Sequence, residues 1–450
     1  MSIANIGAGK QAAASPASLT GVFGARNCLA YGLLGLPLAF VALPLYVILP
    51  NYYAREFGVP LATLGAVLLG ARLFDAFIDP LLGRLSDRLF ARSASAVLAL
   101  GAIAALVLAL GFALLFFPPA LGPVALVAWA GASLLVTYTG YSALSVSHQS
   151  WGAMLGGSEA ERSRIVAWRE GLGLIGVVLA SVVPVALGLR ATTAIFFVAL
   201  GAGWLAWTRA VRPLSRSAAT VAGSGSENTR PASAGSLLQP LRSAGFRRLL
   251  AVFMLNGIAS AVPATLVLFF IQDRLQAPPA MEPVFLGCYF VSAALSIPLW
   301  LAMVKRFGLA LSWLGGMLLA IAVFGWATQI GAGQGLAFLV ICALSGVALG
   351  ADLALPGALL AGTIQANGDL GQAEGAYFGW WNFATKLNLA LAAGLALPLL
   401  SLFGYSPGAR SPQALGALVV AYCILPCLLK LAAATCLYFF IIKTPVSEAL

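Results

Sequence analysis

Apolar runs of about 20 residues recur along the whole chain, and this pattern constrains the fold more than any other feature. A helix rising about 1.5 Å per residue needs about 20 apolar residues to cross the roughly 30 Å hydrocarbon core of a bilayer. About twelve such runs are present: 28–51, 61–83, 94–117, 124–147, 167–189, 191–210, 248–272, 283–304, 309–330, 335–362, 375–403 and 414–442. The pattern predicts an all-α integral membrane protein with twelve transmembrane helices. The boundary between the fifth and sixth runs is weakly marked, because little more than Arg190 separates them.

One long polar stretch, residues 211–247, is rich in Ser, Ala and Gly and is typical of a flexible linker. It divides the chain into two six-helix bundles, 28–210 and 248–442, with polar tails at 1–27 and 443–450. The two halves also share the spacing between a proline and an arginine near the end of their first helix. Pro44 precedes Arg55 by eleven residues, and Pro263 precedes Arg274 by the same interval. This favours a duplicated six-helix unit, a common architecture of secondary transporters.

The charged residues are few and unevenly placed. Only 9% of the chain is charged, against about 25% in soluble proteins, which argues against soluble enzymes and nucleic-acid binders. If the N-terminus is inside, about seventeen of the 25 Lys and Arg residues fall on the cytoplasmic side. Cytoplasmic loops carry such an excess. We therefore expect a multi-pass inner-membrane protein with both termini and the linker in the cytoplasm, no removable signal peptide, the bilayer as its partner, and no nucleic acid.

The chemistry expected of an enzyme or a metal site is missing. The six cysteines fall inside the apolar runs and form no metal-ligand spacing with the lone His148, so the sequence predicts neither a metal nor another cofactor. A nucleotide-binding loop is also missing, which argues against an ATP-driven pump. We expect His148 to be a surface or capping residue, with a proton relay as the alternative. Lys430 is expected to lie at the lipid interface or to have a packing role.

The second apolar run holds three ionisable residues, Arg72, Asp75 and Asp79. Spacings of three and four residues place them on one face of a helix. Charges at membrane depth are costly and usually face a cavity or a partner. Two carboxylates one turn apart do not both ionise readily unless a cation or proton lies between them. The spacing therefore indicates a cation-coupling site, and the alternative is a salt bridge to Arg72 alone.

The loop after this run contains Gly83, Asp87 and Arg88 in a G-x-x-x-D-R pattern. At this position in a twelve-helix chain, it resembles the signature loop of the major facilitator superfamily, which acts as a conformational latch. The run 71–80 (ARLFDAFIDP) resembles the second-helix motif of the glycoside-pentoside-hexuronide:cation symporters, the melibiose-permease-like branch. The resemblance extends over most of the chain.

The resemblance implies roles for particular residues. Asp75 and Asp79 would bind the coupling cation, Trp151 and Arg169 would face the substrate, and Lys386 would link the halves electrostatically. The family's sugar-binding acids are replaced here by Pro37 and Ser147, and the Asn between the paired acids is Ile78. These departures argue against a galactoside-type substrate. Ile78 in place of the Asn favours H+ over Na+, because sodium needs several oxygen ligands and a proton needs one carboxylate.

Alternatives stay open for several of these positions. Lys386 either pairs with Asp352 or alternates between Asp75 and Asp79. The alternative to a substrate-facing Arg169 is an ion pair between Arg169 and its neighbour Glu170. Aromatic and amide side chains are expected to line the cavity or, for the aromatics, to anchor the membrane interface: Tyr138, Tyr141, Gln149, Asn256, Tyr377, Trp380, Trp381 and Asn382.

These observations predict a cation-coupled secondary transporter, not an enzyme, that moves a polar organic solute such as a glycoside or uronide by alternating access. The alternatives are a transporter of a lysolipid or another amphiphile, or an exporter, on the same fold. A monomer is expected.

Overall fold

The computed structural model describes residues 24–59, 61–213, 237–405 and 408–443. The expected linker lies partly outside these ranges, as do nearly all of both expected tails. Ten described helical segments are long and apolar enough to cross a membrane. Helices α4 and α15, with 32 and 29 residues, occupy the second and eleventh expected spans and carry Asp75, Asp79 and Lys386.

The helices of the N-terminal half are α1 (Ala25–Gly32), α2 (Gly35–Leu43), η2 (Pro44–Ile48), α3 (Leu49–Glu56), α4 (Leu61–Arg92), α5 (Ala94–Phe116), α6 (Pro123–Met154) and α7 (Glu159–Thr208). Helix α7 contains two expected spans. Gly188, at φ 77° and ψ 174°, interrupts its helical geometry between them, and Pro184 lies four residues earlier. A backbone at positive φ is accessible to glycine without a Cβ penalty. The weakly marked boundary in the sequence is therefore a sharp kink.

The helices of the C-terminal half are α9 (Gln239–Arg242), α10 (Ala244–Phe269), η3 (Phe270–Leu275), η4 (Pro279–Met281), α11 (Glu282–Phe307), α12 (Leu309–Ala327), α13 (Gly335–Ala354), α14 (Pro356–Ala366), α15 (Glu374–Leu402), α16 (Pro412–Val419), η5 (Val420–Ile424), α17 (Leu425–Leu437) and η6 (Tyr438–Ile442). Helix α10 begins at Ala244, four residues before the expected run, because the Ser243 hydroxyl accepts a hydrogen bond from Phe246 N and caps it.

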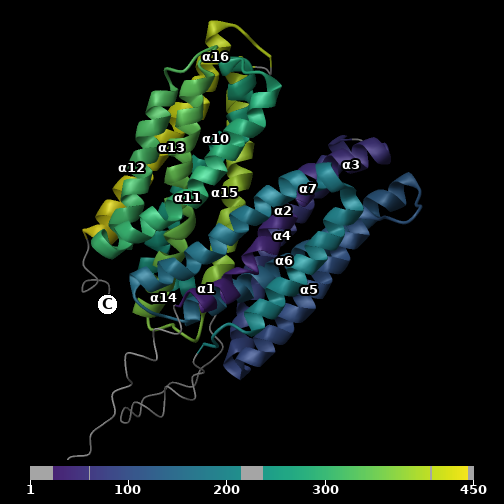
Figure 1. Ribbon diagram of the computed structural model, residues 1–450, viewed down its shortest axis with the longest axis vertical. Helices are drawn as coiled ribbons and strands as arrows, with labels where there is room; N and C mark the ends of the chain where they lie inside the picture. Colours follow the sequence, from purple (N-terminus) through teal and green to yellow (C-terminus); the bar gives the residue numbers. More distant parts are fainter. Residues whose placement is uncertain (1–23, 60, 214–236, 406–407, 444–450) are drawn as a thin grey trace, which may run out of the picture.

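The two halves meet at one end of the molecule and diverge at the other. Figure 1 shows them side by side near α1 and α14 and apart toward α3 and α16. We call these the closed end and the open end. One apolar core lies within the N-terminal half, a second within the open-end part of the C-terminal half, and a third joins C-terminal residues to Val146, Ala153 and Ala167. The third core is the one that spans both halves.

Polar contacts also join the halves at the closed end. Arg162 Nη1 donates to Gln365 Oε1 at 2.8 Å, and Leu309 N donates to Glu159 Oε2 at 2.8 Å. Glu159 and Arg162 lie in the first turn of α7, where the Ser158–Glu161 capping box fixes the start of the helix. The start of α7 is thus attached to α12 and α14 of the other half.

Candidate functional site

An ion cluster lies between the halves, where α4 faces α15. Lys386 Nζ is 2.7 Å from Asp75 Oδ2 and 2.8 Å from Asp79 Oδ2. Both aspartates are buried, at 2% and 0% exposure. The one-turn spacing predicted from the sequence is what lets a single ammonium reach both carboxylates. Of the two partners open to Lys386, the structure places it with the Asp75–Asp79 pair.

Ser142 on α6 completes this cluster, although its position in the sequence did not indicate a role. Its hydroxyl donates to Asp75 Oδ1 at 2.6 Å and accepts from Lys386 Nζ at 2.8 Å. A hydroxyl has one proton to donate and lone pairs to accept with, so both bonds form together. A lone serine in an apolar helix gives little sequence signal, because most such hydroxyls bond back to their own helix. Arg72, on α4 with the two aspartates, lies near Tyr138 of α6.

The predicted latch is a second contact between α4 and α15, closer to the closed end. Asp87 accepts hydrogen bonds from Gly375 N at 2.6 Å and Ala376 N at 2.8 Å. These N–H groups belong to the first turn of α15, where the helix dipole favours an anion. Burial raises the pKa of Asp87 well above its usual value, although the two N–H donors act in the opposite direction. The next residue, Arg88, is exposed.

Glycines allow the two latch helices to touch. A Cβ atom on Gly83 would lie 1.9 Å from Gly375 O, which no side chain tolerates. Gly83 and Asp87 thus meet α15 together, one through close backbone approach and the other through hydrogen bonds. Glu374, the first residue of α15, is fully buried beside them. Its position in the sequence did not indicate a role, because an acid at a helix start is commonplace.

A polar cavity of about 120 Å³ lies within the N-terminal half, between α2, α6 and α7. Tyr141, Gln149 and Arg169 line it. The sequence predicted that Tyr141 and Gln149 line a cavity, and the resemblance implied that Arg169 faces the substrate. Arg169 also forms an ion pair with Glu170, so the self-satisfied pair considered from the sequence is present and lines the same cavity. His148 lines it too. The expectation that His148 is a surface or capping residue is wrong, because α6 continues to Met154 and buries the ring.

The structure does not bring Trp151 to this cavity. Its side chain is fully buried, packs edge-on against Trp207 with ring centroids 5.4 Å apart, and donates to Val211 O at 3.1 Å. This is a correction to the expectation that Trp151 faces the substrate. The sequence placed Trp151 beyond the fourth helix, whereas the extension of α6 turns its side chain into the core of the N-terminal half.

Other predicted cavity residues on α15 contact their own half. The Tyr377 hydroxyl donates to Asp369 Oδ2 at 2.7 Å, in the loop at the closed end. Trp381 stacks on Phe253 with ring centroids 3.7 Å apart and is 6% exposed. Neither residue lines the polar cavity of the N-terminal half.

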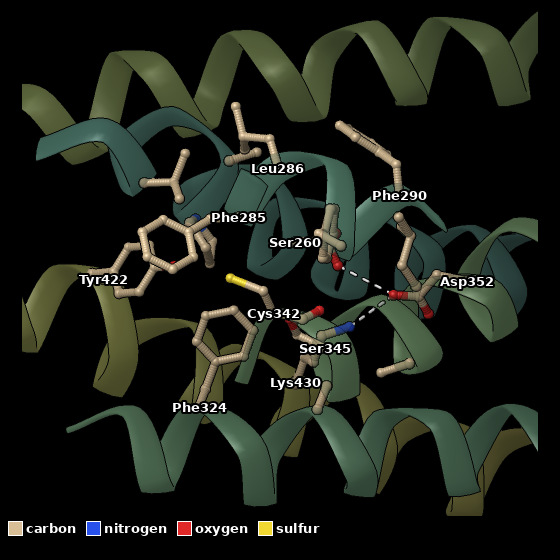
Figure 2. Close-up of a pocket in the computed structure, with 17 residues that line it drawn as sticks. Ser260, Phe285, Leu286, Phe290, Phe324, Cys342, Ser345, Asp352, Tyr422 and Lys430 are labelled. Atoms are coloured by element: carbon tan, nitrogen blue, oxygen red, sulfur yellow. Dashed lines mark hydrogen bonds and ion pairs between the residues drawn. The ribbon is translucent and has the colours of Figure 1, made fainter. Parts of the chain in front are cut away.

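A second buried ion pair lies inside the C-terminal half. Lys430 Nζ donates to Asp352 Oδ2 at 2.9 Å and to Asn256 Oδ1 at 2.7 Å. Asp352 also accepts from Asn256, Ser260 and Trp313. Lys430 is 4% exposed, so the expectation of a lipid-interface position is wrong. Figure 2 shows Asp352, Ser260 and Lys430 together at one end of a cavity.

The sequence matches a family model described as MFS/sugar transport protein over residues 29–444. The chain belongs to this transporter family. It is therefore a membrane transporter of the major facilitator superfamily and not an enzyme. No curated protein matches the sequence significantly.

Solved structures share the twelve-helix fold of this transporter. A bacterial homologue of the iron transporter ferroportin in an outward-facing state superposes with a TM-score of 0.67 at 16% identity, covering 93% of this chain and 99% of that one. The E. coli fucose:proton symporter superposes with a TM-score of 0.66 at 16% identity, covering 92% and 99%. These identities are low, so the likeness concerns the fold.

Proposed function

We propose that the protein is a cation-coupled secondary transporter that moves a polar organic solute by alternating access. The observation that carries this proposal is the ammonium of Lys386 on the C-terminal half, held between Asp75 and Asp79 on the N-terminal half. An ion cluster between two bundles that rock against each other makes their relative position depend on the charge of the carboxylates.

The charges of the cluster suggest how coupling works. Two carboxylates face one ammonium, which leaves one negative charge in a buried site if both acids are ionised. A proton on either acid removes that charge and leaves Lys386 with one ionised partner. The electrostatic link between α4 and α15 is then weaker. Protonation thereby lowers the barrier to separating the halves at the closed end.

The set of oxygen atoms supports H+ over Na+ as the coupling ion. Around the Lys386 ammonium are the carboxylates of Asp75 and Asp79, the hydroxyl of Ser142 and, at 3.3 Å, the backbone carbonyl of Asp75. Ile78, between the two acids in sequence, offers no side-chain oxygen. A proton needs a single carboxylate, whereas sodium would need additional oxygen ligands in the place that Lys386 occupies.

The polar lining between α2, α6 and α7 supports contact with a hydroxyl or acidic group of a solute such as a glycoside or uronide. At about 120 Å³, this cavity holds part of such a molecule. Tyr141 and Gln149 offer hydrogen-bonding groups, and a substrate carboxylate that displaces Glu170 would match the planar guanidinium of Arg169. We further propose that the closed end faces the cytoplasm of an inner-membrane protein that works as a monomer. The excess of Lys and Arg on that side supports this orientation.

Transport into proteoliposomes with imposed pH and sodium gradients tests the proposal. A panel of sugars, uronides and lysolipids is screened first, and counterflow is measured for any solute that is taken up. Asp75→Asn and Asp79→Asn are each expected to retain counterflow but to lose accumulation driven by a pH gradient. Glu56→Gln, an exposed acid at the open end, is the control and should behave as wild type. Unchanged accumulation in both Asn variants, or dependence on sodium alone, would contradict H+ coupling.

A further inference from the structure

A cavity of about 160 Å³ lies inside the C-terminal half, away from the ion cluster at α4 and α15. Its walls come from α10, α11, α12, α13, η5 and α17. Figure 2 shows Phe285, Leu286, Phe324 and Tyr422 toward one end, and Asp352 with Lys430 at the other. Most of the lining is apolar, so the cavity offers a hydrophobic environment with a polar end.

The polar end carries no unsatisfied charge. Asp352 Oδ1 accepts from Asn256 Nδ2 and Trp313 Nε1, and Asp352 Oδ2 accepts from Ser260 Oγ and Lys430 Nζ. Both carboxylate oxygens are therefore bonded, and the lysine neutralises the charge. A charged occupant would lose its hydration without gaining a free counter-charge. The cavity therefore favours a neutral molecule.

Two tyrosines of the lining, Tyr289 and Tyr422, have hydroxyls that make no hydrogen bond to the residues that the structure describes. Tyr422 is 4% exposed. Its ring is fixed by stacking on Phe270, with centroids 4.3 Å apart. A buried hydroxyl without a partner is unfavourable, and a hydroxyl on an occupant would satisfy it.

The volume of the cavity fits about one ring. An apolar protein cavity of about 150 Å³ binds benzene. We propose that this cavity binds a neutral six-membered ring with a single hydroxyl group, of the phenol or cyclohexanol type. The ring packs against the apolar walls, and its hydroxyl forms a hydrogen bond with the hydroxyl of Tyr422. A free sugar fits poorly, because most of its hydroxyls would face Phe285, Leu286 and Phe324 without partners.

This proposal goes beyond coupled transport, because binding is measured without any gradient. Purified full-length protein in one detergent is heated with increasing phenol or cyclohexanol, and the apparent melting temperature is recorded; glucose is the comparison compound. Three variants are tested in parallel: Tyr422→Phe removes the hydroxyl, Ala348→Leu fills the cavity from α13, and Tyr438→Phe alters an exposed tyrosine as the matched control.

Wild type and Tyr438→Phe are expected to show the same saturable stabilisation by phenol. Loss of one hydrogen bond should weaken the apparent phenol affinity of Tyr422→Phe about fivefold, and Ala348→Leu should not respond. Equal responses in wild type, Tyr438→Phe and Tyr422→Phe would overturn the site, as would no saturable response in wild type. Glucose acting as strongly as phenol would overturn the proposed class of ligand. If Ala348→Leu does not fold, the comparison of Tyr422→Phe with Tyr438→Phe decides.

Discussion

Substitution of Ser142 tests the role of the ion cluster most directly. Its hydroxyl bonds to Asp75 and Lys386 at once, so Ser142→Ala removes one donor from the acid and one acceptor from the lysine. Each lost hydrogen bond to a charged group is worth about 1.5–3 kcal/mol. We expect solute accumulation driven by a pH gradient to fall at least about tenfold. The assay is proteoliposome uptake as a function of external pH.

The control for this prediction is Ser181→Ala. The Ser181 hydroxyl is exposed and bonds to its own helix at Val178 O, so its loss should leave transport unchanged. If Ser142→Ala transports like Ser181→Ala at every pH, the hydroxyl has no part in coupling.

The Lys430–Asp352 pair makes a separate prediction about stability. Removing one member leaves the other charged and buried, which costs about 3–5 kcal/mol in proteins. Lys430→Met and Asp352→Asn are each expected to lower the apparent melting temperature markedly. The double variant should recover most of the loss, because no lone charge remains. Lys305→Met, at an exposed end of α11, is the control. Single variants as stable as this control would show that the pair contributes little.

At the scale of helices, the approach of α4 to α15 depends on small residues. A Cβ on Gly83 would lie 1.9 Å from Gly375 O, and one on Gly379 would lie 2.7 Å from Asp79 O. Gly83→Ala is therefore expected to prevent the closed end from closing and to reduce uptake more than tenfold. Gly70→Ala is a matched control on the same helix, because a Cβ there meets nothing within 4 Å. Spin-label distances across the closed end check the prediction, and a closed-end distance unchanged in Gly83→Ala would contradict it.

The sequence predicted the membrane-spanning helices well and the contacts between distant side chains less well. Apolar length identifies a membrane span without knowledge of its neighbours, and the three- and four-residue spacings placed Asp75 and Asp79 on one face. The errors arose where a partner lies far along the chain. Lys430 seemed peripheral because Asp352, its partner, is 78 residues away. Ser142 gave no signal because Lys386 and Asp75 become its neighbours only after folding.

The end of α6 shows a different limit of sequence reasoning. The apolar run was expected to stop at 147, whereas the helix continues to Met154. Hydropathy falls where Ser, His and Gln appear, but the backbone continues because its neighbours bury those side chains. The extension decides the environment of both His148 and Trp151: the ring of His148 stacks on Tyr31, and that of Trp151 packs on Trp207. Periodicity gives the phase of a helix only as far as its boundary is known.

At the scale of the whole molecule, the closed end is predicted to respond to pH through Glu374. One carboxylate oxygen of Glu374 accepts from Gly371 N, and the other is buried without a hydrogen-bond partner among the described residues. Burial raises the pKa of Glu374 from 4.5 to about 7, although hydrogen bonds from nearby backbone N–H groups lower it. Opening the closed end would hydrate this carboxyl and return its pKa toward the usual value of about 4.3.

The direction of the pH effect follows from this difference in pKa. Glu374 binds its proton more tightly when the end is closed, so the closed arrangement is favoured at low pH. That advantage is lost as pH rises from the pKa of the hydrated carboxyl to the value of about 7 in the closed arrangement. The pH facing this end should therefore shift the balance between the two conformations, with alkaline pH favouring opening.

Spin labels at Arg92 and Leu370, on opposite halves and on a background lacking native cysteines, report this equilibrium through their distance distribution. We expect the longer distances to gain population between about pH 5 and pH 8 as Glu374 ionises. Glu374→Gln stays neutral and should remove this part of the pH dependence while Asp75, Asp79 and Asp87 stay in place. A Glu374→Gln profile identical to wild type would assign the response to Asp87, whose pKa is also raised by burial. Protonation of Asp75 or Asp79 would favour opening and so has the opposite sign. Because Glu374 precedes the residues that bind Asp87, its ionisation weakens the contact that keeps the halves together at this end.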